Sequence, residues 1–163
     1  MTPTRQKILS LNAAGRLLDD ERRHGRGIVL ANGCFDVLHV GHVRYLEGAR
    51  REGDLLVVAV NSDSSVRALK GSGRPILPAA ARAELVAALA AVDCVVLFDD
   101  LTVEPLLEAL RPDVHAKGTD YTTDTVPERE VAARLGIRVV IVGDPKHHST
   151  RELLARIRDS QDG

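Results

Sequence analysis

The feature that most constrains the fold of this chain is a short run, His39-Val40-Gly41-His42, between a predicted strand and a predicted helix. Residues 27–32 before it are mostly apolar, and they predict a buried strand that ends at the carboxyl edge of a sheet. Gly33 then allows the backbone to approach an anion closely. Because the N–H groups and dipole of a helix start favour negative charge, two imidazoles there indicate a phosphate site. We therefore interpret this run as part of a nucleoside triphosphate site.

Strand and helix patterns alternate along the rest of the chain, which favours an α/β fold. Strands are expected at 27–32, 55–61, 94–98, 113–117 and 137–142, and helices at 7–24, 40–51, 78–91, 103–110, 126–135 and 149–158, with a further helix capped at Ser62. We predict a single doubly wound, Rossmann-like parallel sheet of about five strands with helices on both faces. In such sheets ligands bind at the carboxyl ends of the strands. The expected organisation is one domain, with a helical extension at 1–25 and a catalytic core at 26–158.

Composition excludes several classes of function. The formal net charge is −1 and aromatic residues make up 2% of the chain, so neither a basic surface nor a set of stacking platforms for nucleic acid is expected. The chain has no P-loop motif, so it is not a P-loop nucleotide-binding protein. The absence of Gly-x-Gly-x-x-Gly after the first strand argues against a dinucleotide-dependent dehydrogenase, and the absence of a Gly-x-Ser-x-Gly elbow argues against a hydrolase with a catalytic triad. Two cysteines and no long apolar run indicate a cytoplasmic protein with no membrane partner.

The loop at 70–75 concentrates glycine and positive charge. Lys70 either contacts a phosphate or lies on a solvated surface, and we favour the phosphate contact. Arg74 and Arg82 are further candidates for the acceptor substrate. The role of Asp36 stays open: it is a simple turn residue, or it orients an imidazole or contacts the acceptor substrate.

Two later segments are also candidates. Ser149 and Thr150 open the last predicted helix, where hydroxyls serve as a simple cap or, with the free N–H groups, bind phosphate. Residues 117–121 end the fourth predicted strand and lie on the ligand edge, where a base or ribose contact is expected. His147 and His148 have no zinc partners at useful spacing, so no protein metal ligand is assigned.

The run Asn32-Gly33-Cys34-Phe35-Asp36-Val37-Leu38-His39-Val40-Gly41-His42 resembles the signature of the cytidylyltransferase-like nucleotidyltransferases. Other stretches are similar to one branch, the D-glycero-β-D-manno-heptose 1-phosphate adenylyltransferases, which supply ADP-heptose for lipopolysaccharide core assembly. These stretches are 32–36, 41–46, 61–66, 69–71, 74–75 and 117–121. The resemblance spans roughly residues 7–158. In many relatives this activity is fused to a sugar kinase domain, and the chain resembles the stand-alone form.

The resemblance implies attack of a sugar phosphate oxygen on the α-phosphorus of ATP, with pyrophosphate leaving. It implies catalytic roles for His39, His42 and Lys70, with Mg²⁺ accompanying ATP on phosphate oxygens and water, and a homodimer. The implied nucleotide-binding residues are Asn32, Gly33, Cys34, Phe35, Gly41, Lys117, Gly118, Asp120, Ser149 and Thr150. One departure is Arg151, where the family usually has Thr. Its side chain either adds charge at the triphosphate or points to solvent.

Two other functions stay open on the sequence. A cytidylyltransferase acting on glycerol 3-phosphate, or a related alcohol phosphate, would share the fold and the histidine pair but differ in base and acceptor. A nucleotide-binding regulatory module without catalysis belongs to a different class. The presence of His39, His42 and Lys70 together argues against that module.

Overall fold

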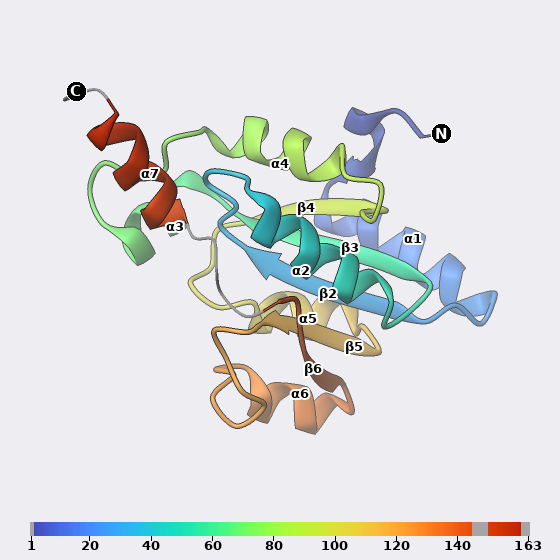
Figure 1. Cartoon of the computed structure of the whole chain (residues 1–163). Coiled ribbons are helices and arrows are strands. Elements are labelled where there is room, and N and C mark those ends of the chain that lie inside the picture. Colours follow the sequence, from blue (N-terminus) through green and yellow to red (C-terminus); the bar gives the residue numbers. More distant parts are fainter. Residues whose placement is uncertain (1, 145–149, 161–163) are drawn as a thin grey trace.

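The computed structural model describes residues 2–144 and 150–160 and is built on one six-stranded sheet (Figure 1). Every strand pairing in it is parallel, and the strand order is β1-β4-β3-β2-β5-β6. The strands are β1 (Ile8–Leu9), β2 (Ile28–Gly33), β3 (Leu55–Asn61), β4 (Cys94–Phe98), β5 (Val114–Gly118) and β6 (Arg138–Val142). The predicted parallel α/β sheet is thus confirmed, with six strands rather than about five.

The additional strand lies in the segment that was expected to be a continuous helix, 7–24. A 3₁₀ turn, η1 (Thr4–Lys7), precedes β1, which pairs in parallel with the edge of β4. Helix α1 (Leu11–Arg23) begins only after Ser10, whose Oγ accepts a hydrogen bond from Ala13 N at 3.2 Å. A strand of two residues is too short to show the period-2 pattern of a strand, which explains the incorrect prediction.

Helices cover both faces of the sheet. Buried side chains of α2 (Val40–Arg50) and α4 (Ala79–Ala87) pack on one face. On the other face pack α1, α5 (Glu104–Leu110) and α6 (Arg129–Leu135). Helices α3 (Asp63–Lys70) and α7 (Thr150–Asp159) instead border the cavity described below.

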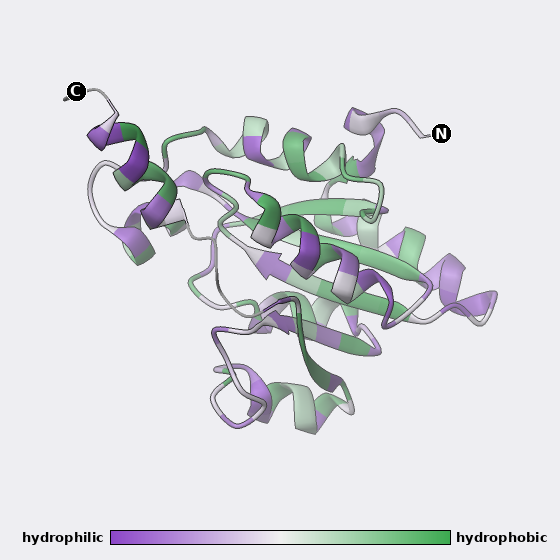
Figure 2. Cartoon of the chain, viewed as in Figure 1, coloured by the Kyte–Doolittle hydropathy of each residue, from purple (hydrophilic) through white to green (hydrophobic). Residues whose placement is uncertain are grey.

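The central strands are apolar along most of their length, as the hydropathy colouring of Figure 2 shows. Every residue of β3 is buried, which is expected for a parallel strand covered on both faces. With only two phenylalanines in the chain, the core consists mainly of Val, Leu, Ile and Ala side chains. Burial of each Val or Leu contributes roughly 1.5–3 kcal/mol, so many medium-sized side chains replace a few aromatic ones.

The direction in which successive strands are added to the sheet changes at β2. From β2 the chain proceeds outward through β3 to β4, whereas β5 and β6 are added on the opposite side of β2. The crossovers on the two sides leave a crevice beyond the carboxyl ends of β2 and β5, which is where ligands bind in sheets of this kind. Asn32 and Gly33 end β2 at this crevice, and Lys117 and Gly118 end β5 there.

Candidate active site

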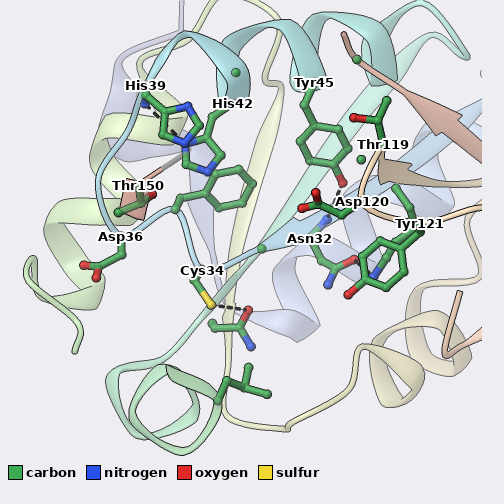
Figure 3. A pocket seen from close by; sticks show the side chains of 18 of the residues that line it. Asn32, Cys34, Asp36, His39, His42, Tyr45, Thr119, Asp120, Tyr121 and Thr150 are labelled. Carbon is green, nitrogen blue, oxygen red and sulfur yellow. Dashed lines mark hydrogen bonds between the residues drawn. The ribbon is translucent and has the colours of Figure 1, made fainter. Parts of the chain in front are cut away.

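A cavity of about 1080 Å³ opens at this crevice, beside the first turn of α2 (Figure 3). It brings together nearly all the residues that the sequence singled out, from segments far apart in the chain. The sequence-predicted residues that line it are Asn32, Gly33, Cys34, Phe35, Asp36, His39, Gly41, His42, Lys70, Arg74, Lys117, Gly118, Asp120 and Thr150. Ser149 lies outside the described residues, as do His147 and His148. Arg82 is described but does not line the cavity.

Asp36 anchors the loop between β2 and α2. Its carboxylate accepts hydrogen bonds from Ile76 N at 2.6 Å, from Leu77 N at 3.1 Å and from Arg74 Nε. Burial alone would raise the pKa of Asp36, but these hydrogen bonds and the Arg74 charge outweigh burial and lower the pKa. Of the roles left open for Asp36, the structure therefore shows one directly, which is to fasten this loop to residues 74–77.

Arg82 is fully buried beneath the same loop. Its guanidinium donates to Cys34 O at 2.5 Å, to Leu77 O at 2.9 Å and to Asp63 Oδ1 at 2.8 Å. These contacts use three of its five N–H donors, and they give Arg82 a role in holding the loop, outside the lining of the cavity. The sequence showed a cation in an alanine-rich helix but could not show that the helix buries it.

His39 and His42 lie at the start of α2, as the N-cap and the third residue of the helix. Their rings are stacked, with centroids 3.8 Å apart and planes inclined by 24°. The rings of Phe35 and His42 are packed edge to face, with their centroids 5.1 Å apart. Phe35 has a φ of +47°, a left-handed conformation that is unfavourable for a side chain of this size, and it turns the loop back toward the helix.

The surroundings of His42 favour its neutral form. Burial, then the proximity of His39 and Lys70, lowers the pKa of His42 to about 4. The backbone N–H of His39 donates to His42 Nδ1 at 3.4 Å, so in the neutral ring the proton is on Nε2. His42 therefore offers an N–H donor, and it acquires a positive charge most readily when an anion approaches.

Lys70 ends helix α3 and faces the same cavity. Three other cations line the cavity and each is paired: Arg44 with Asp144, Arg74 with Asp36, and Lys117 with Glu128. Among the cavity-lining cations of residues 2–144 and 150–160, Lys70 alone has no carboxylate partner within 4.0 Å. Its charge is therefore available to a ligand.

The side chain of Tyr45 bridges β2 and β5 at the point where the two strands separate. Backbone pairing between these strands ends at Ala31 and Ala116. The Tyr45 hydroxyl then donates to Ala116 O at 2.8 Å and accepts from Asn32 N at 3.4 Å. Burial raises the pKa of Tyr45. Its spacing of three residues from His42 places both on one face of α2, a signal that could have identified it from sequence.

The other side of the cavity contains a buried ion pair. Lys117 Nζ lies 3.4 Å from Glu128 Oε2 and 4.7 Å from the centroid of the Tyr121 ring. Both members of the pair are almost completely buried. Glu128 was not predicted from the sequence, because no local pattern sets it apart from other acidic residues at a helix start. Asn61, another unpredicted lining residue, accepts from Cys34 Sγ at 3.8 Å.

The described residues contain neither a metal-binding cluster nor a membrane-spanning helix. Among the described residues there is no cluster of three or more His, Cys, Asp or Glu side chains arranged to hold a metal ion. No helix in the described part of the chain has the length and apolar character needed to cross a bilayer. Thr150 begins α7 and lines the cavity.

Comparison with protein families agrees with this geometry. Residues 30–157 match the cytidylyltransferase-like family. The chain is 48% identical over 143 residues to the bifunctional protein HldE of Syntrophotalea carbinolica, covering 88% of this chain and 29% of that protein. It is 50% identical over 142 residues to HldE of Alcanivorax borkumensis, covering 87% and 30%. The chain thus spans about a third or less of the length of these curated relatives.

Solved structures show the same architecture. The lipopolysaccharide core biosynthesis protein of Thermoplasma volcanium superposes with a TM-score of 0.64 and 28% identity, over 75% of this chain and all of that one. Pantothenate synthetase of Thermus thermophilus superposes with a TM-score of 0.63 over 88% of this chain and 63% of that one. At 18% identity the second comparison shows a shared fold alone.

Proposed function

The chain belongs to the cytidylyltransferase-like family of nucleotidyltransferases, and we propose that it joins ATP and D-glycero-β-D-manno-heptose 1-phosphate to form ADP-heptose and pyrophosphate. The observation that carries the reaction type is the stacked pair His39 and His42 at the start of α2, in one cavity with the unpaired cation Lys70. The choice of substrates is supported by the similarity to HldE and to a lipopolysaccharide core biosynthesis protein.

In the proposed reaction a phosphate oxygen of the sugar attacks the α-phosphorus of ATP, and the bond to the bridging oxygen of the leaving pyrophosphate breaks. The attacking oxygen is already anionic near neutral pH, so the site needs no strong base. Positioning and charge stabilisation then supply most of the rate enhancement. A cavity lined by imidazoles, a lysine and a helix start fits this requirement.

The histidine pair acts on the charge that develops during transfer. His42 presents an Nε2 donor to the phosphates, and its buried position makes this donor preorganised and poorly hydrated. His39 stacks on His42 and shares the same end of the cavity. Lys70 neutralises a phosphate of either the nucleotide or the acceptor, and Thr150 contributes a hydroxyl at the start of α7.

Mg²⁺ is part of the proposal as the companion of ATP. Three of the five carboxylate residues that line the cavity, Asp36, Glu128 and Asp144, are paired with basic side chains, and the described residues form no cluster of metal-binding side chains. Mg²⁺ would therefore be held by phosphate oxygens and water, where it withdraws negative charge from the phosphates. The proposal also includes a homodimer, which the family resemblance implies, and a cytoplasmic location, since both substrates are phosphorylated metabolites.

The test is pyrophosphate release with Mg²⁺, crossing ATP and CTP with heptose 1-phosphate and glycerol 3-phosphate. We expect turnover with ATP and heptose 1-phosphate, and loss of that turnover in His42→Ala. His24→Ala is the matched control, because His24 is exposed at the end of α1, before β2 begins, and does not line the cavity.

Each other result of this test has a defined meaning. Turnover only with CTP and glycerol 3-phosphate would keep the nucleotidyl transfer and overturn the choice of substrates. Nucleotide binding with no pyrophosphate release from any pair would contradict the proposed acceptors. It would also revive the alternative of a regulatory module.

A further inference from the structure

A buried histidine outside the proposed reaction, His115, lies next to the nucleotide side of the cavity. In β2 the side chains of Ile28 and Leu30 face the layer formed by α1, α5 and α6, so Asn32 projects to the same side. His115 is directly opposite Leu30 on the neighbouring strand β5, and Lys117 is two residues further on. One face of two adjacent strands therefore places His115, Lys117 and Asn32 together.

The contacts of Asn32 fix the orientation of its side-chain amide. Lys117 Nζ lies 3.5 Å from Asn32 Oδ1, and an ammonium group can only donate. His115 Nε2 lies 3.1 Å from the same oxygen. Since Oδ1 accepts from Lys117, the neutral ring of His115 must carry its proton on Nε2 and donate it. The reversed amide would direct its NH₂ group at the Lys117 ammonium, which can only donate.

His115 is well suited to hold this orientation permanently. It is fully buried, and burial, then the nearby charge of Lys117, lowers its pKa to about 3. Nδ1 of His115 has no hydrogen-bond partner within the described residues. An unpaired buried acceptor is unfavourable, so the histidine is not explained by its own packing. Its one polar contact among those residues is the contact to Asn32.

With Oδ1 held, the NH₂ group of Asn32 has no partner among the described residues, and Asn32 lines the cavity. We propose that His115 is a positioning residue for nucleotide binding, which holds the Asn32 amide so that Nδ2 donates to an oxygen of the bound nucleoside triphosphate. The oxygen belongs to the ribose or to a phosphate. The inference rests on the proposed function only in requiring that the chain binds a nucleoside triphosphate.

The experiment is calorimetric titration of the whole chain with MgATP, or with MgCTP if the wild type selects CTP. The variants are His115→Leu, which removes the donor, and His115→Gln, whose amide NH₂ can replace Nε2. Asn32→Ala and the double variant complete a mutant cycle. Val139→Ala is the control, since Val139 lies opposite His115 on the neighbouring strand β6 and packs against the same side of the sheet. Circular dichroism verifies that each variant is folded.

We expect His115→Leu to weaken nucleotide binding about 3- to 10-fold, in line with the loss of one neutral hydrogen bond. His115→Gln and Val139→Ala should stay within about twofold of wild type. In the Asn32→Ala background, His115→Leu should cause no further loss. In turnover assays His115→Leu should raise the KM for the nucleotide and leave kcat nearly unchanged.

Two results would overturn the proposal. One is binding by His115→Leu that equals the wild type. The other is an equal weakening by His115→Leu in the wild-type and Asn32→Ala backgrounds, which would indicate a purely structural role. Binding does not require the heptose acceptor, so a wrong acceptor would defeat the proposed function and leave this test intact.

Discussion

The rings of His39 and His42 are stacked with their centroids 3.8 Å apart, one at the N-cap of α2 and the other three residues later. Two imidazoles this close disfavour a second positive charge between them. Burial adds to this effect at His42, which is therefore mostly uncharged in the ligand-free chain near neutral pH, and a bound triphosphate would supply negative charge that favours its protonation. If the proposed phosphate site is correct, ligand binding and protonation of this pair are coupled.

In the proposed reaction, replacing His42 removes a preorganised donor to the phosphates. In His42→Ala we expect kcat to fall about 10²–10³-fold, as for the loss of one oxyanion donor elsewhere. Steady-state pyrophosphate release measures the change, with His24→Ala expected to match the wild type. A fall of less than about threefold in kcat would remove His42 from the proposed catalytic group.

The titration of His42 provides a second prediction. In the ligand-free chain its ring should titrate near pH 4, and MgATP should raise the midpoint because anionic phosphates favour the imidazolium. Between pH 6.5 and 4 the unfolded chain binds this proton and the folded chain does not, so His42 lowers stability as the pH falls. Ring chemical shifts in an NMR titration measure the midpoint, with His42→Gln for assignment. A ligand-free midpoint near 6.5 would contradict the described surroundings.

Lys70 should act through its unpaired charge. Lys70→Gln is expected to lower kcat/KM about 10²-fold, by analogy with the loss of one phosphate-directed group. The matched control is Arg67→Gln, one turn earlier on α3, which removes an exposed charge that does not line the cavity. Equal effects of the two changes would show that Lys70 contributes only to the general field of the helix.

Asp36→Asn tests the loop anchor. At pH 7 the change should lower the free energy of unfolding by about 1.5–3 kcal/mol, the range for hydrogen bonds to a charged group. Because folding lowers the pKa of Asp36, its stabilisation is present above the unfolded pKa of about 4 and is lost as the pH falls through the folded value. The difference from wild type should therefore shrink below about pH 4.

Urea unfolding at neutral and acidic pH measures this difference. Asp124→Asn, at an exposed position, is the control and should leave stability unchanged at both pH values. If the loss caused by Asp36→Asn is the same at both pH values, the carboxylate charge does not account for the anchor.

The sequence could predict that several candidate residues lie together in one cavity, because those residues are adjacent in the chain. His39, Gly41 and His42 lie within four residues, and an apolar strand before them defines the sheet edge. Strand alternation likewise predicted which ends of distant strands meet, which brought Lys117 to the same cavity. These features depend on local patterns and on the general rule for parallel sheets.

Other features depend on contacts between distant segments, which no local pattern shows. Arg82 resembles a surface cation until the structure shows three protein acceptors around it. Glu128 becomes notable only beside Lys117, and His115 only beside Asn32. The strand Ile8–Leu9 was missed because its pairing with β4, not its own sequence, makes it a strand.

The central claim is nucleotidyl transfer from ATP to a sugar phosphate in the cavity at the carboxyl ends of β2 and β5. The most direct test incubates the chain with heptose 1-phosphate and ATP radiolabelled at either the α- or the γ-phosphate. The account predicts that the α-label appears in a nucleotide sugar and the γ-label in pyrophosphate, with both transfers lost in His42→Ala. Appearance of the γ-label in the sugar product would indicate phosphoryl transfer and contradict the account.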